Sequence, residues 1–234
     1  MMVSSFIDTN VLIAYVFLIE PKNKIAKYIL SEEYDNIYGS ENVFLEFDDR
    51  TFEKRESLLN FYENFILYLS DYTKNYISRK HMLEYVENLD FSDEKEYNEI
   101  LQSISLFWNH YSPQDSSIPV DLMVEYINRL RNELEFGVCD KIDFCKSCII
   151  NIDDFHKRVN HYKNSDGLFE KLYSCGMHKE DIEICLDAYD YNLTLNHPMD
   201  FITFDKKYYK CVSRENLGFN NVKCYKDYEF LISS

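Results

Sequence analysis

Apolar and polar positions form their clearest pattern near the two ends of the chain. Residues 4–7 are a short apolar run that leads into Asp8, and no charge follows before Glu20. This pattern is typical of a buried strand that continues directly into a buried helix, beginning at Asn10 or Val11. Further strands are predicted at residues 37–39, 200–204 and 221–225.

Most of the remaining chain shows the spacing of apolar positions that predicts helices. A short helix is expected at residues 23–30, and Ser40 is a good N-cap for a helix that starts at Glu41 and runs to Leu69. Gly137 is a predicted helix end. Amphipathic helices are further expected at 76–88, 93–110, 120–136, 152–161, 167–173 and 178–192, with a final helical turn at 227–231.

The order of these elements predicts the fold class α/β. Strand signals near both ends of the chain indicate one α/β domain with a central parallel sheet, interrupted by a mostly α-helical insertion. We place the first half of the domain at residues 1–70, the insertion at 71–175 and the second half at 176–234. Only 5 Gly and 4 Pro are present, which favours many helices over a loop-rich all-β fold.

Composition sets further bounds on the protein. With 234 residues, 46% of them apolar, the chain is long enough to bury a core. The longest uncharged apolar run, residues 11–19, is too short to cross a bilayer and lacks the preceding basic residues of a signal peptide. We therefore expect a cytoplasmic protein that does not bind membranes. The net charge of −16 argues against a nucleic-acid binder that depends on clustered Lys and Arg alone, although bound divalent metals can reverse the local field.

The seven cysteines are expected to be reduced, because their spacing is irregular and no export signal precedes them. Cys145 and Cys148 form a C-x-x-C pair, but a zinc site would need two further ligands. His156 and His161 lie five residues apart, and no second cysteine pair accompanies them. The sequence therefore does not favour a structural zinc site.

Four acidic residues lie at positions in the sequence pattern that simple exposure to solvent does not explain well. Asp8 and Asp205 each follow a predicted strand directly, and the carboxyl ends of parallel strands meet at one edge of a sheet. Glu46 borders the apolar side of its helix, and Asp181 is in line with the apolar positions of its own helix. An alternative is that these acids are helix caps and surface positions, as Asp8 or Thr9 would be at a helix start.

A cluster of carboxylates needs a counter-charge. Two carboxylates about 5 Å apart repel each other by about 3 kcal/mol at an effective dielectric constant near 20. Oxygen ligands of this kind suit Mg²⁺ or Mn²⁺. Such ions can activate a water molecule for attack on a phosphodiester and can stabilise the leaving oxygen.

Four segments of the sequence resemble those of the PIN-domain nucleases. They are D-T-N-V-L-I at Asp8, an early helical acid at Glu46, D-x-x-I-x-x-x-A at Asp181 and I-T-F-D-K-K-Y at Asp205. The resemblance covers residues 3–50 and 176–232, and it implies a three-layer α/β/α fold that cleaves RNA. The interval between Glu46 and Asp181 is far longer than in the compact toxin-type members of that family.

The resemblance also implies roles for individual residues in a divalent-metal-dependent endoribonuclease. The catalytic residues, which would bind Mg²⁺ or Mn²⁺ directly or through water, are Asp8, Glu46, Asp181 and Asp205. The residues that would support them are Thr9, Asn10 and Thr203. The nearest rivals of Glu46 and Asp181 as ligands are Glu41, Asp187 and Asp190.

RNA is the expected substrate, and a protein inhibitor or a second copy of the chain are further candidate partners. Lys206 and Lys207 follow Asp205 directly, and Lys157 and Arg158 lie in DFHKRVNHYK, where basic and aromatic residues mix. These four residues are candidates for contact with RNA; the alternatives are ordinary surface lysines and a packed helix. The alternative function is a catalytically weak or inactive PIN-like scaffold that binds a protein or RNA partner through its helical insertion.

Overall fold

The computed structural model describes residues 3–18, 20–91, 94–111, 117–152 and 167–231. The chain divides into two compact units, which are described separately below. The first unit consists of Met1–Val16, Lys22–Arg50 and Lys141–Ser234. The second consists of Phe17–Pro21 and Thr51–Asp140.

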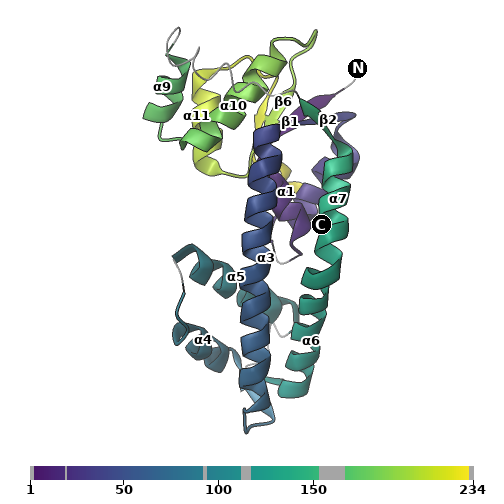
Figure 1. Cartoon of the computed structure of the whole chain (residues 1–234), viewed down its shortest axis with the longest axis vertical. Helices are drawn as coiled ribbons and strands as arrows, with labels where there is room; N and C mark the ends of the chain where they lie inside the picture. The colour runs from purple at the N-terminus through teal and green to yellow at the C-terminus, as the bar shows by residue number, and fades with distance from the viewer. Residues whose placement is uncertain (1–2, 19, 92–93, 112–116, 153–166, 232–234) are drawn as a thin grey trace. The chain divides into compact units, whose positions relative to one another are not determined.

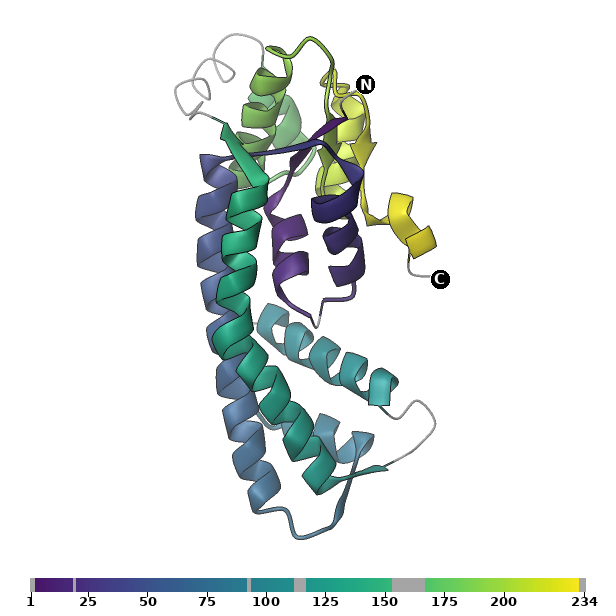
Figure 2. The same cartoon turned by 90° about the vertical axis from the view of Figure 1, so that its right-hand side faces the viewer.

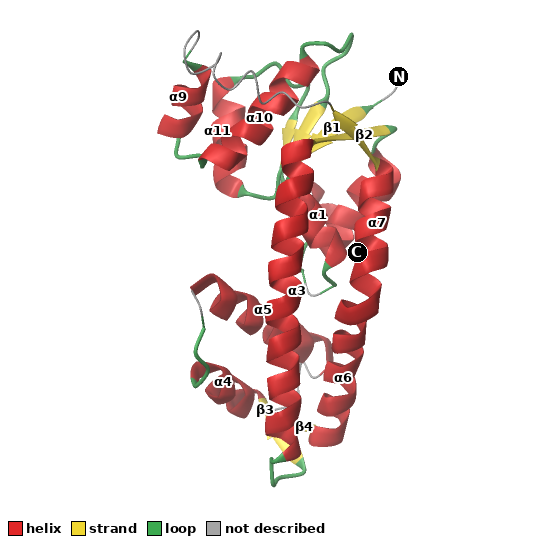
Figure 3. Cartoon of the chain, viewed as in Figure 1, coloured by secondary structure: helices red, strands yellow, loops and turns green. Residues whose placement is uncertain are grey.

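A five-stranded sheet forms the centre of the first unit. Its strands are β1 (Ser4–Ile7), β2 (Asn36–Ser40), β5 (Ile149–Ile152), β6 (Asp200–Ile202) and β7 (Val222–Lys223). Their order is β5-β2-β1-β6-β7, and every neighbouring pair is parallel. This sheet, of which β1 and β2 are labelled in Figure 3, brings together segments from near both ends of the chain, as predicted, and adds β5 from its middle.

Helices lie on both sides of this sheet. Between β1 and β2 the chain forms α1 (Thr9–Val16), α2 (Asn23–Tyr28) and the π-helical turn Ile29–Glu33. After β5 and β6 it forms α9 (Leu168–Ser174), α10 (Lys179–Asn192) and α11 (Lys206–Glu215). The crossovers from β1 to β2 and from β5 to β6 run in opposite directions, so a shared right-handed sense places their helices on opposite faces. Figure 1 shows α9, α10 and α11 together on one side, and Figure 2 shows α1 beside α2.

The first unit is thus α/β with a mostly parallel central sheet, consistent with a three-layer α/β/α arrangement. Its core centres on β1, where Phe6 and Ile7 are fully buried and the Phe6 ring stacks on Phe201 with ring centroids 5.8 Å apart. The apolar run after Asp8 is buried on nearly every side in α1, as the sequence predicts. The helix begins at Thr9, and the Val11 amide donates to the Asp8 carbonyl at 3.0 Å.

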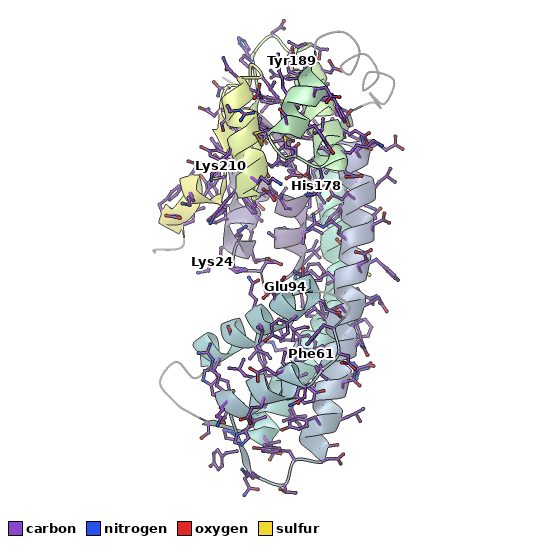
Figure 4. The ribbon with its side chains drawn as sticks, turned by 90° about the vertical axis from the view of Figure 1, so that its left-hand side faces the viewer. Lys24, Phe61, Glu94, His178, Tyr189 and Lys210 are labelled. Atoms are coloured by element: carbon purple, nitrogen blue, oxygen red, sulfur yellow. A yellow bond between two sulfur atoms is a disulfide. The ribbon has the colours of Figure 1, made fainter. Side chains whose placement is uncertain are left out.

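The second unit is mostly helical. The helix α3 (Glu41–Ser70), predicted from Glu41 to Leu69, runs through both units as one element. The other elements are the antiparallel pair β3 (Tyr76–Ser78) and β4 (Ser117–Pro119), and α4 (Arg79–Glu87), α5 (Glu94–Tyr111), α6 (Val120–Asn132) and the π-helical turn Glu133–Gly137. Phe61, labelled in Figure 4, stacks on Phe65 with centroids 5.7 Å apart, and the Tyr62 hydroxyl hydrogen-bonds Ser103 at 2.9 Å.

Several local predictions in the middle of the chain are wrong: the strands β3, β4 and β5 were not predicted, and β3 replaces the start of the helix expected at 76–88. Gly137 does not end a helix, because the chain continues through it into α7 (Val138–Cys148). A Cβ atom at this position would meet the Glu133 carboxylate at 2.7 Å, so the glycine makes room for that side chain. The strand β5 was not predicted at all. It follows α7 directly, so no turn residue separates its apolar residues from those of the helix. Residues 153–161 of the helix predicted there lie outside the described part of the chain.

The expectation that all cysteines are reduced is also wrong for one pair. Cys175 and Cys211 form a disulfide, with Cα atoms 5.7 Å apart, that joins the end of α9 to α11. Their sequence separation of 36 residues gives no pairing signal, since only the packing of the two helices brings them together. Cys145 and Cys148, the C-x-x-C pair, are both free in α7.

No helix in the described ranges is both long and apolar enough to cross a membrane.

Candidate functional site

Asp8 is the buried centre of the candidate site. It directly follows β1, and its backbone amide donates to the Ile202 carbonyl at 3.0 Å, which extends the pairing of β1 with β6 by one residue. Its side chain therefore emerges at the carboxyl edge of two parallel strands, where ligands collect in open α/β sheets. The residue is only 2% exposed. A carboxylate in this position must be satisfied by its neighbours, because water does not reach it.

Two polar side chains, one following each strand end, contact the Asp8 carboxylate. The Thr203 hydroxyl donates to Asp8 Oδ2 at 2.7 Å, and Asn10 Nδ2 donates to the same oxygen at 2.6 Å. Asn10 also accepts a hydrogen bond from the Phe204 amide at 2.7 Å through Oδ1. The side chains predicted to support Asp8 thus form a closed network that fixes its orientation.

Glu46 reaches the site from α3. The Thr9 hydroxyl donates to Glu46 Oε2 at 2.7 Å, and Arg50 contacts Glu46 Oε1 at 3.0 Å, one helical turn further on. The Glu46 side chain is 27% exposed, so it borders the buried side of α3 as the sequence predicts. Thr9 therefore links the start of α1 to α3 and holds one oxygen of Glu46 beside the Asp8 network.

Asp181 lies in the first turn of α10. Its Oδ2 accepts a hydrogen bond from the backbone amide of His178, labelled in Figure 4, at 3.4 Å. Tyr208, fully buried on α11, donates its hydroxyl hydrogen to the Asp181 carbonyl at 2.8 Å. Asp181 therefore caps the start of α10 through its hydrogen bond from the His178 backbone amide. Its carboxylate also acts electrostatically on Asp8.

Asp205 is the N-cap of α11. Its Oδ1 accepts from the amides of Lys207 at 2.6 Å and Tyr208 at 2.9 Å, and its own amide donates to the Thr203 hydroxyl at 3.1 Å. Unlike Asp8, this side chain is exposed. The capping alternative raised for the strand-end acids thus describes Asp205, whereas the Asp8 carboxylate accepts from the side chains of Thr203 and Asn10 as well as from the Thr9 backbone.

Electrostatic interactions connect the four acids. Burial raises the pKa of Asp8 to about 7, and the negative charges of Glu46 and Asp181 add to this rise, while the hydrogen bond from Thr203 opposes it. Burial also raises the pKa of Asp181, with further contributions from Glu46 and Asp205. No Lys or Arg in the described part of the chain is ion-paired with Asp8. The site therefore carries more negative charge than its surroundings neutralise.

The same four acids do not form a finished coordination sphere. Among the described residues, no three His, Cys, Asp or Glu side chains are placed so that they could hold a metal ion as they stand. Glu46 is engaged with Thr9 and Arg50, and Asp205 Oδ1 with the backbone of α11. Their carboxylate oxygens are nevertheless the donors that Mg²⁺ and Mn²⁺ prefer, and these ions retain several waters that can bridge to distant ligands.

The other candidate residues occupy different surroundings. Glu41 is exposed and lines a surface groove of about 380 Å³ together with Phe44 and Ile149. Asp187 is buried on α10 and accepts from Asn42 Nδ2 at 3.0 Å, and Asp190 is buried one turn further along.

The basic candidates divide into two groups. Lys206 and Lys207 are exposed in the first turn of α11, directly after Asp205. Lys157 and Arg158 lie outside the described residues.

Two residues of the site were not identified from the sequence. Arg50 lies four residues after Glu46, which is the spacing of a helical ion pair and could have identified it. Tyr208 gave no signal, because its contact with α10 depends on how two helices pack.

Comparisons with known proteins add no relative to this description. A scan against protein-family models, a search of curated proteins and a search of solved structures found no match to this chain.

Proposed function

We propose that this chain is a divalent-metal-dependent ribonuclease with a PIN-like fold, in which Asp8, Glu46, Asp181 and Asp205 bind Mg²⁺ or Mn²⁺. The observation that carries the proposal is the position of the Asp8 carboxylate, which is buried at the carboxyl edge of the parallel sheet. The charges of two further acids, Glu46 and Asp181, contribute to its raised pKa. Because this edge is the usual ligand position in open α/β sheets, an unneutralised acid there favours a cationic ligand.

The raised pKa of Asp8 indicates how a cation would act. With a pKa of about 7, a large fraction of Asp8 is protonated at neutral pH, whereas a bound divalent ion favours the ionised form. Metal binding therefore competes with protons, and we expect the affinity for the ion to fall as the pH drops below 7.

The residues around the acids have distinct roles in this proposal. Thr203 and Asn10 orient the Asp8 carboxylate, and Thr9 orients Glu46. Arg50 partly neutralises Glu46 at one oxygen and leaves a positive group beside the site. When bound, the divalent ion would supply the positive charge that activates water for attack on a phosphodiester and stabilises the leaving oxygen.

The test is cleavage of end-labelled single-stranded RNA with Mn²⁺, with Mg²⁺ and with EDTA. We expect metal-dependent cleavage by the wild type and a loss of roughly 100-fold or more in Asp8→Asn and Asp205→Asn. The second substitution is informative because Asn is also a good N-cap, so α11 keeps its cap while the charge is removed.

The matched control is Asp49→Asn, which removes one negative charge from an exposed position on α3. Its cleavage rate should equal that of the wild type when all proteins are purified in parallel. Cleavage that persists equally in Asp8→Asn and Asp205→Asn would contradict the proposal and would point to a contaminating nuclease.

A further inference from the structure

We propose that Lys22, Tyr225 and Lys206 form a binding subsite for single-stranded RNA, in which Tyr225 stacks on a base and the two ammonium groups contact phosphate. This inference rests on the proposed ribonuclease function and names the surface that would guide the substrate to the carboxylates. We refer to these three residues as the Tyr225 subsite.

Two ammonium groups converge on one aromatic ring in this subsite. Lys22 Nζ lies 4.5 Å from the centroid of the Tyr225 ring, and Lys206 Nζ lies 5.5 Å from it. Lys22 is fixed further by its hydrogen bond to the Phe204 carbonyl at 3.2 Å. Lys206 is exposed, while Lys22 and Tyr225 are half-buried, so a ligand can reach all three.

The arrangement suits an anion that also carries an aromatic base. Like charges around one ring repel each other, and a phosphate placed near both would offset that repulsion. Arg or Lys beside an aromatic ring is the combination that binds single strands, because bases stack on the ring while the ammonium groups contact the backbone. In a chain with a net charge of −16, such a cluster runs against the overall composition.

The neighbouring charges leave this subsite net basic. Glu229 is an exposed acid of the 3-10 helix Tyr225–Leu231. Asp227, also in the 3-10 helix Tyr225–Leu231, accepts from the Cys224 amide at 2.7 Å. Lys226 is exposed in the same segment, and Lys207 and Lys210 are exposed on α11, where Figure 4 labels Lys210.

The position of the subsite connects it to the carboxylates. Phe204, whose carbonyl accepts from Lys22, donates its own amide hydrogen to Asn10, which in turn contacts Asp8. Lys206 follows Asp205 directly. A strand whose phosphates lie on the two lysines would therefore pass close to the acidic edge, and the lysines would offset the repulsion between that edge and the RNA backbone.

The experiment measures binding without cleavage. A fluorescein-labelled oligouridylate of about 12 nucleotides is titrated with protein in EDTA, and fluorescence anisotropy is recorded over a range of salt concentrations. Tyr225→Ala should weaken binding by about 5- to 100-fold, the effect of losing one stacked base. The double variant Lys22→Gln/Lys206→Gln should make the salt slope less steep by about 1.4, because single strands contribute about 0.7 per phosphate contact.

The controls separate stacking from charge. Lys74→Gln/Lys80→Gln removes the same charge from exposed positions of the second unit and should leave the salt slope unchanged. Tyr225→Phe keeps the ring and should retain most of the affinity. Inorganic polyphosphate has charge but no bases, so its affinity should fall in the lysine variant and not in Tyr225→Ala.

Each remaining outcome overturns the inference. An unchanged affinity and salt slope in the lysine variant, or no binding of oligouridylate by the wild type, would show that the Tyr225 subsite does not bind RNA. Equal weakening by the Lys74/Lys80 control would show a general charge effect. Because EDTA abolishes metal binding, loss of binding in the variants supports the subsite even if the wild type shows no cleavage with Mn²⁺.

Discussion

Two aspartates at opposite edges of the same sheet are both buried but are differently neutralised. Asp8 follows β1 at the carboxyl edge, whereas Asp200 opens β6 at the amino edge, and each is only 2% exposed. Asp200 Oδ1 accepts from Asn220 at 2.7 Å and Asn221 at 2.9 Å, and Lys223 lies 3.0 Å from Oδ2. Asp8 has hydrogen bonds from Asn10 and Thr203, and within the described ranges it has no cationic partner.

The difference between the two sites is reflected in their pKa values. Burial acts to raise the pKa of Asp200, but hydrogen bonds from Asn221, Lys223 and Asn220 outweigh it and hold the pKa below its ordinary value. Asp8 lies deeper, so burial prevails and raises its pKa, and the charges of Glu46 and Asp181 add to this rise. A buried carboxylate that is paired with a lysine is explained by its structural role. A buried carboxylate without a cationic partner instead indicates a ligand site.

The largest expected effect is the loss of the Asp200 network. Asp200→Ala leaves the Lys223 ammonium with Glu33 as its remaining carboxylate and leaves two amides without their acceptor, so the free energy of unfolding should fall by about 3 to 5 kcal/mol. Urea denaturation at pH 7 measures this change.

The pH dependence of this loss of stability tests whether the charge of Asp200 is its cause. Because the folded-state pKa is lowered, the stabilisation by Asp200 is present above the ordinary carboxyl pKa and disappears as the pH falls through the folded value. The difference between wild type and Asp200→Ala should shrink accordingly in acid. A difference that is independent of pH would show that packing, not charge, stabilises this edge.

The next largest effect has the opposite sign. Since the pKa of Asp8 is raised to about 7, its ionisation destabilises the fold as the pH rises from the ordinary carboxyl range through 7. In EDTA, Asp8→Asn should therefore raise the free energy of unfolding at pH 8 by about 2 to 4 kcal/mol and change it little at pH 3.5. Denaturation curves at the two pH values measure the difference.

Adding Mn²⁺ provides a second test of the role of Asp8 in stability at pH 8. Saturating Mn²⁺ at about 100 times its dissociation constant should stabilise the wild type by about 2.7 kcal/mol at pH 8 and leave Asp8→Asn unchanged. An equal shift in both proteins would place the bound metal away from Asp8. A lower stability of Asp8→Asn in EDTA at pH 8 would contradict the electrostatic description of the site.

The smallest effect concerns one hydrogen bond. Thr203→Val removes the hydroxyl that donates to Asp8 and accepts from the Asp205 amide, and we expect a loss of about 1 to 2 kcal/mol at pH 8. Thr203→Ser keeps the hydroxyl and should lose much less. Thermal unfolding of the two variants, compared at pH 8 and pH 5, shows whether the cost follows the ionisation of Asp8.

Local patterns predicted the elements around the site well. The strand at residues 4–7 and the long helix from Glu41 are confirmed, because each has a clear apolar period or a strong cap. The convergence of the β1 and β6 ends is also confirmed, since parallel strands from distant segments share one edge. The strand β5 was missed because it follows α7 directly, without a turn residue that would mark where the helix ends.

Features that depend on packing could not be predicted. The Cys175–Cys211 disulfide and the Tyr208 contact with α10 arise only when α9, α10 and α11 are packed together. The role of Asp205 as the α11 cap was foreseeable from its residue type, whereas the approach of Lys22 to Tyr225 joins segments that no local pattern connects. The metal ligands and the ribonuclease activity remain proposals to be tested by the experiments above.

The hydrogen bond between Thr203 and Asp8 joins residues that are 195 positions apart in the chain. During synthesis at about 5 to 20 residues per second, Asp8 is added to the chain about 10 to 40 seconds before Thr203. Until β6 is made, β1 can pair with β2 but lacks its other central neighbour. The acidic edge therefore cannot assemble on a nascent chain that ends before β6, which delays any activity of this site until translation has passed that strand.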